Sequence, residues 1–217
     1  MSKSFNDFSA SLNSNVLDRI VFEAKKSAIE SNDATEVTSD NATSVLAAHN
    51  SSMCKTLTDI AKTLSNEHVA KMLFATKYDA TRINRSERSN ARYNVYAYEK
   101  DVNIARVLCK VASLNHYTRA ILSSAIALQK NDMLITHRDA QSACSLDVKT
   151  DATREKLISA TKYQKNVAAS TANTQSSSSI NALQAFSVLV ETRDAANNVC
   201  YKVNLDADVT KKLLALI

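Results

Sequence analysis

The chain has 217 residues and a formal net charge of +5, and it contains no glycine, no proline and no tryptophan. A chain of this length and average composition would contain about fifteen glycines and about eleven prolines. Without glycine, no Walker loop, dinucleotide fingerprint, nucleophile elbow or regular EF-hand can be written, which excludes these classes of enzyme and binding site.

The missing residues also bear on the fold. Tight hairpin turns and helix C-termini, which usually place glycine at positive φ, must use Asn or Asp instead. Without proline, helices run on without kinks and end at polar clusters. The composition therefore predicts a mostly α fold rather than a fold with many hairpins.

Helical periodicity begins near the N-terminus. Apolar residues recur at three- and four-residue spacing over residues 15–30, and Phe5, Phe8 and Leu12 extend this seam. The polar run 31–44 predicts a loop with several candidate helix N-caps. A second helix is expected from about residue 44 to residue 64, followed by a restart capped near residues 65–67.

The clearest pattern in the chain lies between Ile104 and Leu128. Its apolar residues alternate spacings of three and four over this whole range, which is typical of a packed seam in a long bundle helix. Traced backward, the same helix would include residues 82–100. The pattern therefore predicts one very long helix.

A basic strip precedes this seam, in a part of the chain where positive charge is concentrated. Residues 61–130 carry 12 basic and 5 acidic side chains. On a helix, the spacing predicts a ridge formed by Arg82, Arg85, Arg88, Arg92, Tyr93 and Tyr96. We favour contact of this ridge with a protein partner or with solvent. Binding of phosphates in DNA or RNA is the open alternative.

The last third of the chain has mixed patterns. Residues 145–165 are compatible with a helix, and residues 180–191 predict a further helix. Residues 169–181 between them have the low complexity of a flexible linker, with a helical continuation as the alternative. Alternation then predicts a strand, which must pair elsewhere in the chain or across a subunit boundary. A final helix, capped by Asp206 or Asp208, ends the chain. We expect this segment to dock on a partner through Val199, Tyr201, Val203, Leu213, Leu214 and Ile217.

The chain shows little sign of catalytic or metal chemistry. The four cysteines are far apart in the sequence, as expected of free thiols in a reducing compartment. The four histidines form no zinc-binding motif. We expect no catalytic residue, no cofactor and no metal. The first residues do not have the pattern of a secretory leader, and no apolar stretch is long enough to cross a bilayer, so we expect synthesis inside a cell and no membrane partner.

These patterns predict a mostly α protein: a helical bundle with one very long helix and a short β element near the C-terminus. We expect a bundle domain over residues 1–168 and a helix-strand-helix segment over 169–217, which either joins that domain or docks on a neighbour. The predicted function is non-enzymatic: a structural or assembly protein of a larger oligomeric particle, most concretely a virion component associated with a phage capsid or tail. The alternative is a basic helical nucleic-acid-binding protein that uses the Arg82–Arg92 ridge.

Overall fold

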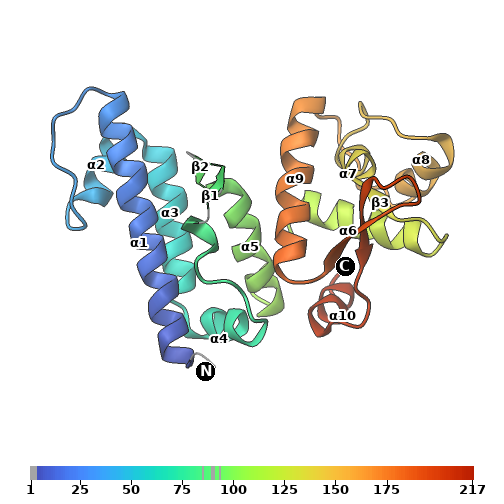
Figure 1. Cartoon of the computed structure of the whole chain (residues 1–217), viewed down its shortest axis with the longest axis horizontal. Coiled ribbons are helices and arrows are strands. Elements are labelled where there is room, and N and C mark those ends of the chain that lie inside the picture. The colour runs from blue at the N-terminus through green and yellow to red at the C-terminus, as the bar shows by residue number, and fades with distance from the viewer. Residues whose placement is uncertain (1–3, 85, 89–90, 93) are drawn as a thin grey trace. The chain divides into compact units, whose positions relative to one another are not determined.

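A computed structural model of the chain describes residues 4–84, 86–88, 91–92 and 94–217, with side chains described for 4–84 and 94–217. The fold is mostly helical with a three-stranded sheet near the C-terminus, which confirms the predicted fold class. The chain divides into two compact units, Met1–Val102 (unit 1) and Asn103–Ile217 (unit 2) (Figure 1). This division differs from the boundary that we predicted at residue 168, and residues 169–217 form part of unit 2.

Unit 1 is helical and contains one small pair of antiparallel strands. Its elements are α1 (Phe5–Glu30), α2 (Ala42–His49), α3 (Ser51–Leu64), α4 (Glu67–Ala75), the 3-10 helix η1 (Arg82–Asn84), β1 (Ser86–Arg88), β2 (Ala91–Arg92) and the start of α5 (Val95–Leu108). At 26 residues, α1 is the longest helix in the described part of the chain. It packs against α2, α3 and α4. Phe8 and Leu12 are buried on this helix, so the apolar seam does extend toward the N-terminus as predicted.

Unit 2 is built around a central helix, α6. Its elements are α6 (His116–Gln129), β3 (Ile135–Thr136), α7 (His137–Cys144), α8 (Ala152–Ser159), α9 (Ala169–Ala185), β4 (Leu189–Arg193), β5 (Val199–Val203) and α10 (Asp208–Leu214). α6 contacts α7, α8, α9, β3 and β5. Its residues Ile121, Leu122 and Leu128 are fully buried and form the centre of the apolar core.

The seam that we predicted as one helix over residues 104–128 is divided between α5 and α6. α5 ends at Leu108 and α6 begins at His116. Between them, Lys110 adopts a left-handed φ of 60°. The prediction of a continuous helix here is wrong because lysine is a good helix former and does not signal a helix end in the sequence. The longest helix is α1 instead.

The serine-rich residues 169–181, which we predicted as a flexible linker, form most of α9. Ser176, Ser178 and Ser179 are buried on this helix, which contacts α6 and α7. The hydroxyl of Ser178 donates to the carbonyl of Thr174 at 2.9 Å, so it is satisfied within the helix. The linker prediction is wrong because the composition resembles that of a loop, whereas small side chains also allow neighbouring helices to approach closely.

Left-handed residues other than glycine occur at helix ends and in the β4–β5 turn. The described residues with positive φ are Asn32, Lys77, Lys110, Asp132, Lys162, Ser187 and Asn197. We predicted Asn or Asp at such positions, but three lysines and a serine also occur there. After α4 and α5, the Tyr78 and Val111 N–H groups donate to carbonyls five residues earlier, at 3.1 and 3.0 Å. This bond is the mark of a Schellman motif, formed here without glycine.

The predicted C-terminal strand is β5, and it pairs on both sides within the chain. The sheet is antiparallel with the order β3-β5-β4. β4 occupies residues that we predicted as helix, because α9 ends at Ala185 and Ser187 turns the chain. The predicted capping of the last helix by Asp206 or Asp208 is wrong, since Ala207 is the N-cap and makes no side-chain hydrogen bond.

Candidate functional site

An apolar pocket lies near the C-terminus in unit 2. Its volume is about 580 Å³, which is within the range of typical ligand pockets. The walls come from α6, the end of β5 and the last residues of the chain. The lining residues are Ser123, Ile126, Gln129, Lys130, Val203, Leu205, Leu214 and Ile217. We call this site the C-terminal pocket.

Gln129 joins two walls of the C-terminal pocket. Its Oε1 accepts a hydrogen bond from the Val203 N–H at 2.7 Å, and its Nε2 donates to the Val203 carbonyl at 3.2 Å. Both polar atoms of this amide are therefore already used. Lys130 is exposed and has no ion-pair partner among the residues with described side chains. The pocket thus combines a mainly apolar lining with one exposed lysine.

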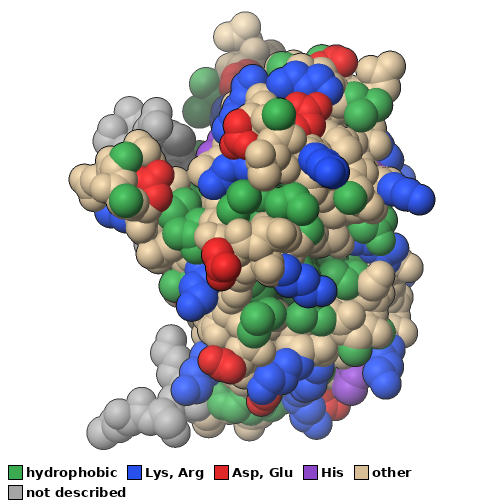
Figure 2. All heavy atoms as spheres, turned by 90° about the vertical axis from the view of Figure 1, so that its right-hand side faces the viewer, with side chains coloured by type: hydrophobic (Ala, Val, Ile, Leu, Met, Phe, Trp, Pro, Cys, Tyr) green, Lys and Arg blue, Asp and Glu red, His purple; other side chains and the backbone are tan. Residues whose placement is uncertain are grey.

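The end of the chain supplies the remaining apolar wall. Leu213 is fully buried and holds α10 to the unit. Leu214 and Ile217 are partly exposed and line the pocket, and Leu205 is 48% exposed. On the face drawn in Figure 2, hydrophobic side chains lie exposed between lysine and arginine side chains. The apolar lining of the pocket, with Lys130 among its residues, can bind an apolar group that carries a negative charge nearby.

The predicted docking residues are only partly brought together. Val203, Leu214 and Ile217 line the same pocket. Leu213 is a core residue, while Val199 and Tyr201 belong to β5 and do not contribute to the pocket. The sequence analysis did not predict Ile126 and Gln129 of α6 as site residues, because it considered only the apolar seam of this helix. An isoleucine just beside such a seam is the signal that could have indicated Ile126.

The basic strip does not form the helical ridge that we predicted. Residues 82–92 contain η1, β1 and β2, and α5 begins only at Val95. Arg82 Nε bonds Asp101 Oδ2 at 2.7 Å, so this arginine serves an internal ion pair. Tyr96 is 49% exposed. Arg85 and Tyr93 lie outside the described residues, and so do the side chains of Arg88 and Arg92; a partner for the strip remains a prediction.

Asp101 is the centre of a buried polar cluster in unit 1. Its Oδ2 accepts hydrogen bonds from the Tyr78 hydroxyl at 2.6 Å and from Arg82 Nε at 2.7 Å. Burial raises the pKa of the Asp101 carboxyl to about 6, although the positive charge of Arg82 and the two hydrogen bonds act against this rise. Because the carboxyl is buried, we interpret the cluster as a link between the 78–84 segment and α5.

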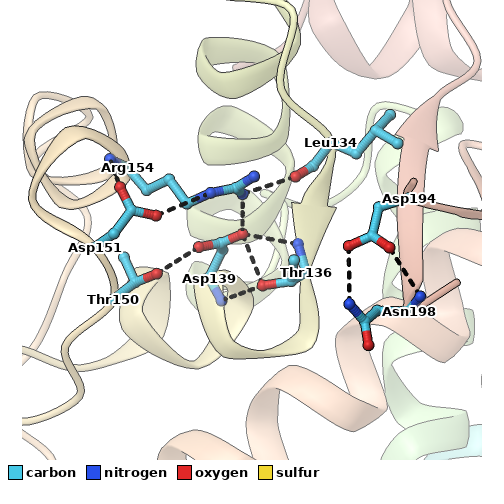
Figure 3. Close-up of polar contacts among 8 residues, drawn as sticks. All are labelled: Leu134, Thr136, Asp139, Thr150, Asp151, Arg154, Asp194 and Asn198. Carbon is cyan, nitrogen blue, oxygen red and sulfur yellow. Dashed lines mark hydrogen bonds and ion pairs between the residues drawn. The ribbon is translucent and has the colours of Figure 1, made fainter. Parts of the chain in front are cut away.

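A second buried carboxylate, Asp139, joins three segments of unit 2 (Figure 3). Its two oxygens accept hydrogen bonds from the Thr136 N–H and hydroxyl and from the Thr150 hydroxyl, each at 2.8 Å. Arg154 Nη1 lies 2.5 Å from Oδ2 and also donates to the Leu134 carbonyl at 2.9 Å. Every group in this network has a partner within it, so its role is to hold α8 against the start of α7.

A polar chain links His137 with Ser177, Gln141 and Asn173, and it contains a serine–histidine pair. His137 Nε2 lies 3.0 Å from Ser177 Oγ, and Gln141 Nε2 lies 3.3 Å from His137 Nδ1. A donor at Nδ1 leaves the ring proton on Nε2, and the Ser177 hydroxyl donates to the Asn173 carbonyl at 2.9 Å. In this tautomer the ring donates to the serine, whereas a base that activates a serine accepts its proton.

Comparison with protein-family models, with curated proteins and with solved structures gave no significant match for this chain. Within the described residues, no cluster of histidine, cysteine and carboxylate side chains could hold a metal ion. In the same part of the chain, no helix is both long enough and apolar enough to cross a membrane.

Proposed function

We propose that this protein is a non-enzymatic assembly component that docks on a partner protein through the C-terminal pocket. In its most specific form, the proposal is a virion component associated with a phage capsid or tail. The observation that carries the docking part is the pocket itself: about 580 Å³ lined mainly by apolar side chains, of which three belong to the docking set predicted from the sequence.

The chemistry of the pocket defines the kind of partner that fits. Ile126, Val203 and Leu214 offer an apolar lining for a large aliphatic or aromatic side chain of the partner. Lys130 at the rim offers a charge to an Asp or Glu close to that side chain in the partner sequence. An acidic segment with one apolar anchor is therefore the partner that we propose.

The test uses Leu205→Asp, which places a carboxylate at the rim of the pocket beside an apolar lining. We expect this variant to enter the particle of its source at least about tenfold less than the unchanged chain, a loss of about 1.4 kcal/mol, because the carboxylate removes an apolar contact and repels the acidic segment of the partner. The measurement is the amount of the chain that co-sediments with the assembled particle. Equal incorporation of the variant would overturn the proposal.

A matched control separates docking from folding. Leu17 on α1 is 43% exposed, close to the 48% of Leu205, and belongs to unit 1, whereas all the residues that line the pocket belong to unit 2. We expect Leu17→Asp to leave incorporation unchanged. Removal of residues 209–217 is a poorer test because Thr210 and Leu213 are fully buried, so their loss would disturb the core itself.

Nucleic-acid binding by the basic strip is the second candidate function. It is tested with the purified chain. We expect no salt-dependent binding of random duplex or single-stranded DNA at two salt concentrations. Binding that falls steeply with salt and is lost in a variant with Arg85→Glu and Arg88→Glu would favour the nucleic-acid alternative over docking.

A further inference from the structure

The sheet of unit 2 ends in an exposed edge strand, β4. The strand order β3-β5-β4 places β5 on one side of β4, and no strand of the described residues lies on its other side. Val190 is 46% exposed, and Glu191 and Arg193 are exposed as well. β4 contributes no residue to the C-terminal pocket. This edge is therefore a surface separate from the docking site proposed above.

The alternation of hydrogen-bonded and non-hydrogen-bonded residue pairs in the β4–β5 hairpin shows which backbone groups of β4 face away from β5. The Asn204 N–H donates to the Val188 carbonyl at 2.9 Å, and the Asp194 N–H donates to the Asn198 carbonyl at 3.1 Å. Because bonded and non-bonded pairs alternate in an antiparallel ladder, Val190 and Thr192 also bond toward β5. The N–H and C=O groups of residues 189, 191 and 193 consequently face away from β5.

The hairpin that carries this edge is well ordered at its turn. Asp194 Oδ1 accepts hydrogen bonds from the Ala196 and Asn198 N–H groups at 2.9 and 2.8 Å, and its Oδ2 accepts one from the Asn198 side chain at 3.1 Å (Figure 3). Asn197 takes the left-handed conformation with φ 65°. A turn closed in this way holds β4 in register and presents a preformed edge.

The charges on the edge are self-complementary in one register. An antiparallel copy centred on Glu191 would place two carboxylates directly opposite each other, which is destabilising. A copy centred on Thr192 places Glu191 opposite Arg193 of the second strand, and this pair occurs twice by symmetry. The outward N–H and C=O groups of residue 191 in one strand then form hydrogen bonds with those of residue 193 in the other strand, and this bonded pair also occurs twice. Glu191 has no ion-pair partner among the residues with described side chains.

We propose that β4 of one chain pairs with β4 of a second copy about a two-fold axis at Thr192, which joins the two three-stranded sheets. Strand addition at a free edge supplies backbone hydrogen bonds, and the reciprocal Glu191–Arg193 pairs select the partner and the register. The contact is a small one, so we expect a weak dimer that forms at micromolar or higher concentration. It does not depend on the pocket or its partner.

The test exchanges charges at the edge. Glu191→Arg alone and Arg193→Glu alone each place like charges opposite each other, so each variant should be monomeric where the unchanged chain doubles its mass. An equimolar mixture of the two variants restores both opposite-charge pairs and should dimerise again. The chain with both changes should also dimerise with itself. Sedimentation equilibrium over a hundredfold range of concentration measures these masses.

A control and two contrary outcomes complete the test. Glu36→Arg reverses a carboxylate that is exposed on unit 1, and it should leave the mass unchanged. If the unchanged chain stays monomeric at every concentration, the charges of β4 keep its edge in contact with water, and the proposal is overturned. Dimers that persist in both single variants would also overturn it. Neither result bears on the Leu205→Asp test, because that variant alters a different surface.

Discussion

Both units bury an aspartate beside an arginine, and the two sites differ in how the carboxylate is satisfied. In unit 2, donors from Thr136, Thr150 and Arg154 reach both oxygens of Asp139. In unit 1, the bonds to Asp101 all end on Oδ2, and its Oδ1 has no hydrogen-bond partner in the described part of the chain. Similar burial therefore does not produce equivalent ion pairs. The number of donors that reach each oxygen makes the difference.

The largest effect is expected from breaking the satisfied site. Arg154→Met keeps the length of the side chain but leaves Asp139 as a buried charge without its cation. We expect the free energy of unfolding to fall by about 3 kcal/mol, as for other buried pairs that lose one partner. Urea denaturation followed by circular dichroism measures the change.

The neighbouring Arg138 provides the control for this variant. It is exposed, and its Nε donates to the Lys149 carbonyl at 2.8 Å. We expect Arg138→Met to cost less than about 1 kcal/mol, because the loss of an exposed hydrogen bond is compensated by water. Equal losses for the two variants would mean that the Asp139 network does not hold α8 in place.

An intermediate effect, visible in the pH dependence, is expected from Asp101. Its folded-state pKa of about 6 lies above the ordinary value of 3.8, so the folded state binds the proton more tightly than the unfolded state does. The contribution of this group to stability is present below pH 3.8 and is lost as the pH rises to about 6. Over that interval the loss amounts to about 2–3 kcal/mol.

Asp101→Asn tests the direction of this change in stability with pH, because asparagine does not titrate. Relative to the unchanged chain, the variant should gain stability between pH 4 and pH 7 by roughly the 2–3 kcal/mol that the unchanged chain loses. Urea titrations at four pH values in this range measure the difference. A difference that is constant with pH, or that changes in the opposite direction, would show that Asp101 is as well satisfied as Asp139.

The smallest effect is expected where the two units are alike, at helix ends with a left-handed lysine. Lys77 in unit 1 and Lys110 in unit 2 are exposed and adopt φ of 56° and 60°. Glycine has no Cβ penalty in this conformation, although it also increases the entropy of the unfolded chain. We expect Lys77→Gly and Lys110→Gly each to raise the thermal midpoint, with a gain of about 0.5–1 kcal/mol.

Lys130 is the matched control for these glycine variants. It caps α6 with an ordinary right-handed φ of −65°. We expect Lys130→Gly to give no gain, since glycine there only adds freedom to the unfolded chain. Gains of similar size at all three lysines would argue against backbone strain as the cause. A gain in one unit only would show that the units differ in their helix ends as well as in their carboxylates.

Much of the secondary structure could be predicted from local pattern. Apolar periodicity indicated α1 and the helices that follow the 31–44 loop, and alternation indicated β5. The predictions failed where a residue adopts a conformation that its type does not signal. Lys110 ends a helix with a left-handed turn, and the serines of α9 are buried in a helix although their composition is that of a linker.

Three of the eight residues that line the C-terminal pocket belong to the docking set predicted from the sequence. Val203, Leu214 and Ile217 belong to one short, visibly apolar segment of the sequence, so the sequence predicted that they act together. Ile126 and Gln129 are more than 70 residues earlier in the chain, and only the bonds between Gln129 and Val203 bring them to the same site. No local pattern carries that information.

The amino-acid sequence by itself determined the mostly helical fold and the exclusion of glycine-dependent chemistry, because these depend on the intrinsic backbone preferences of each residue and on short-range periodicity. Only the tertiary structure decided which helices end early, which buried carboxylate is fully bonded, and which apolar side chains share a pocket. Those outcomes depend on donors and surfaces supplied by residues far away in the chain, whose contribution is set when the units fold.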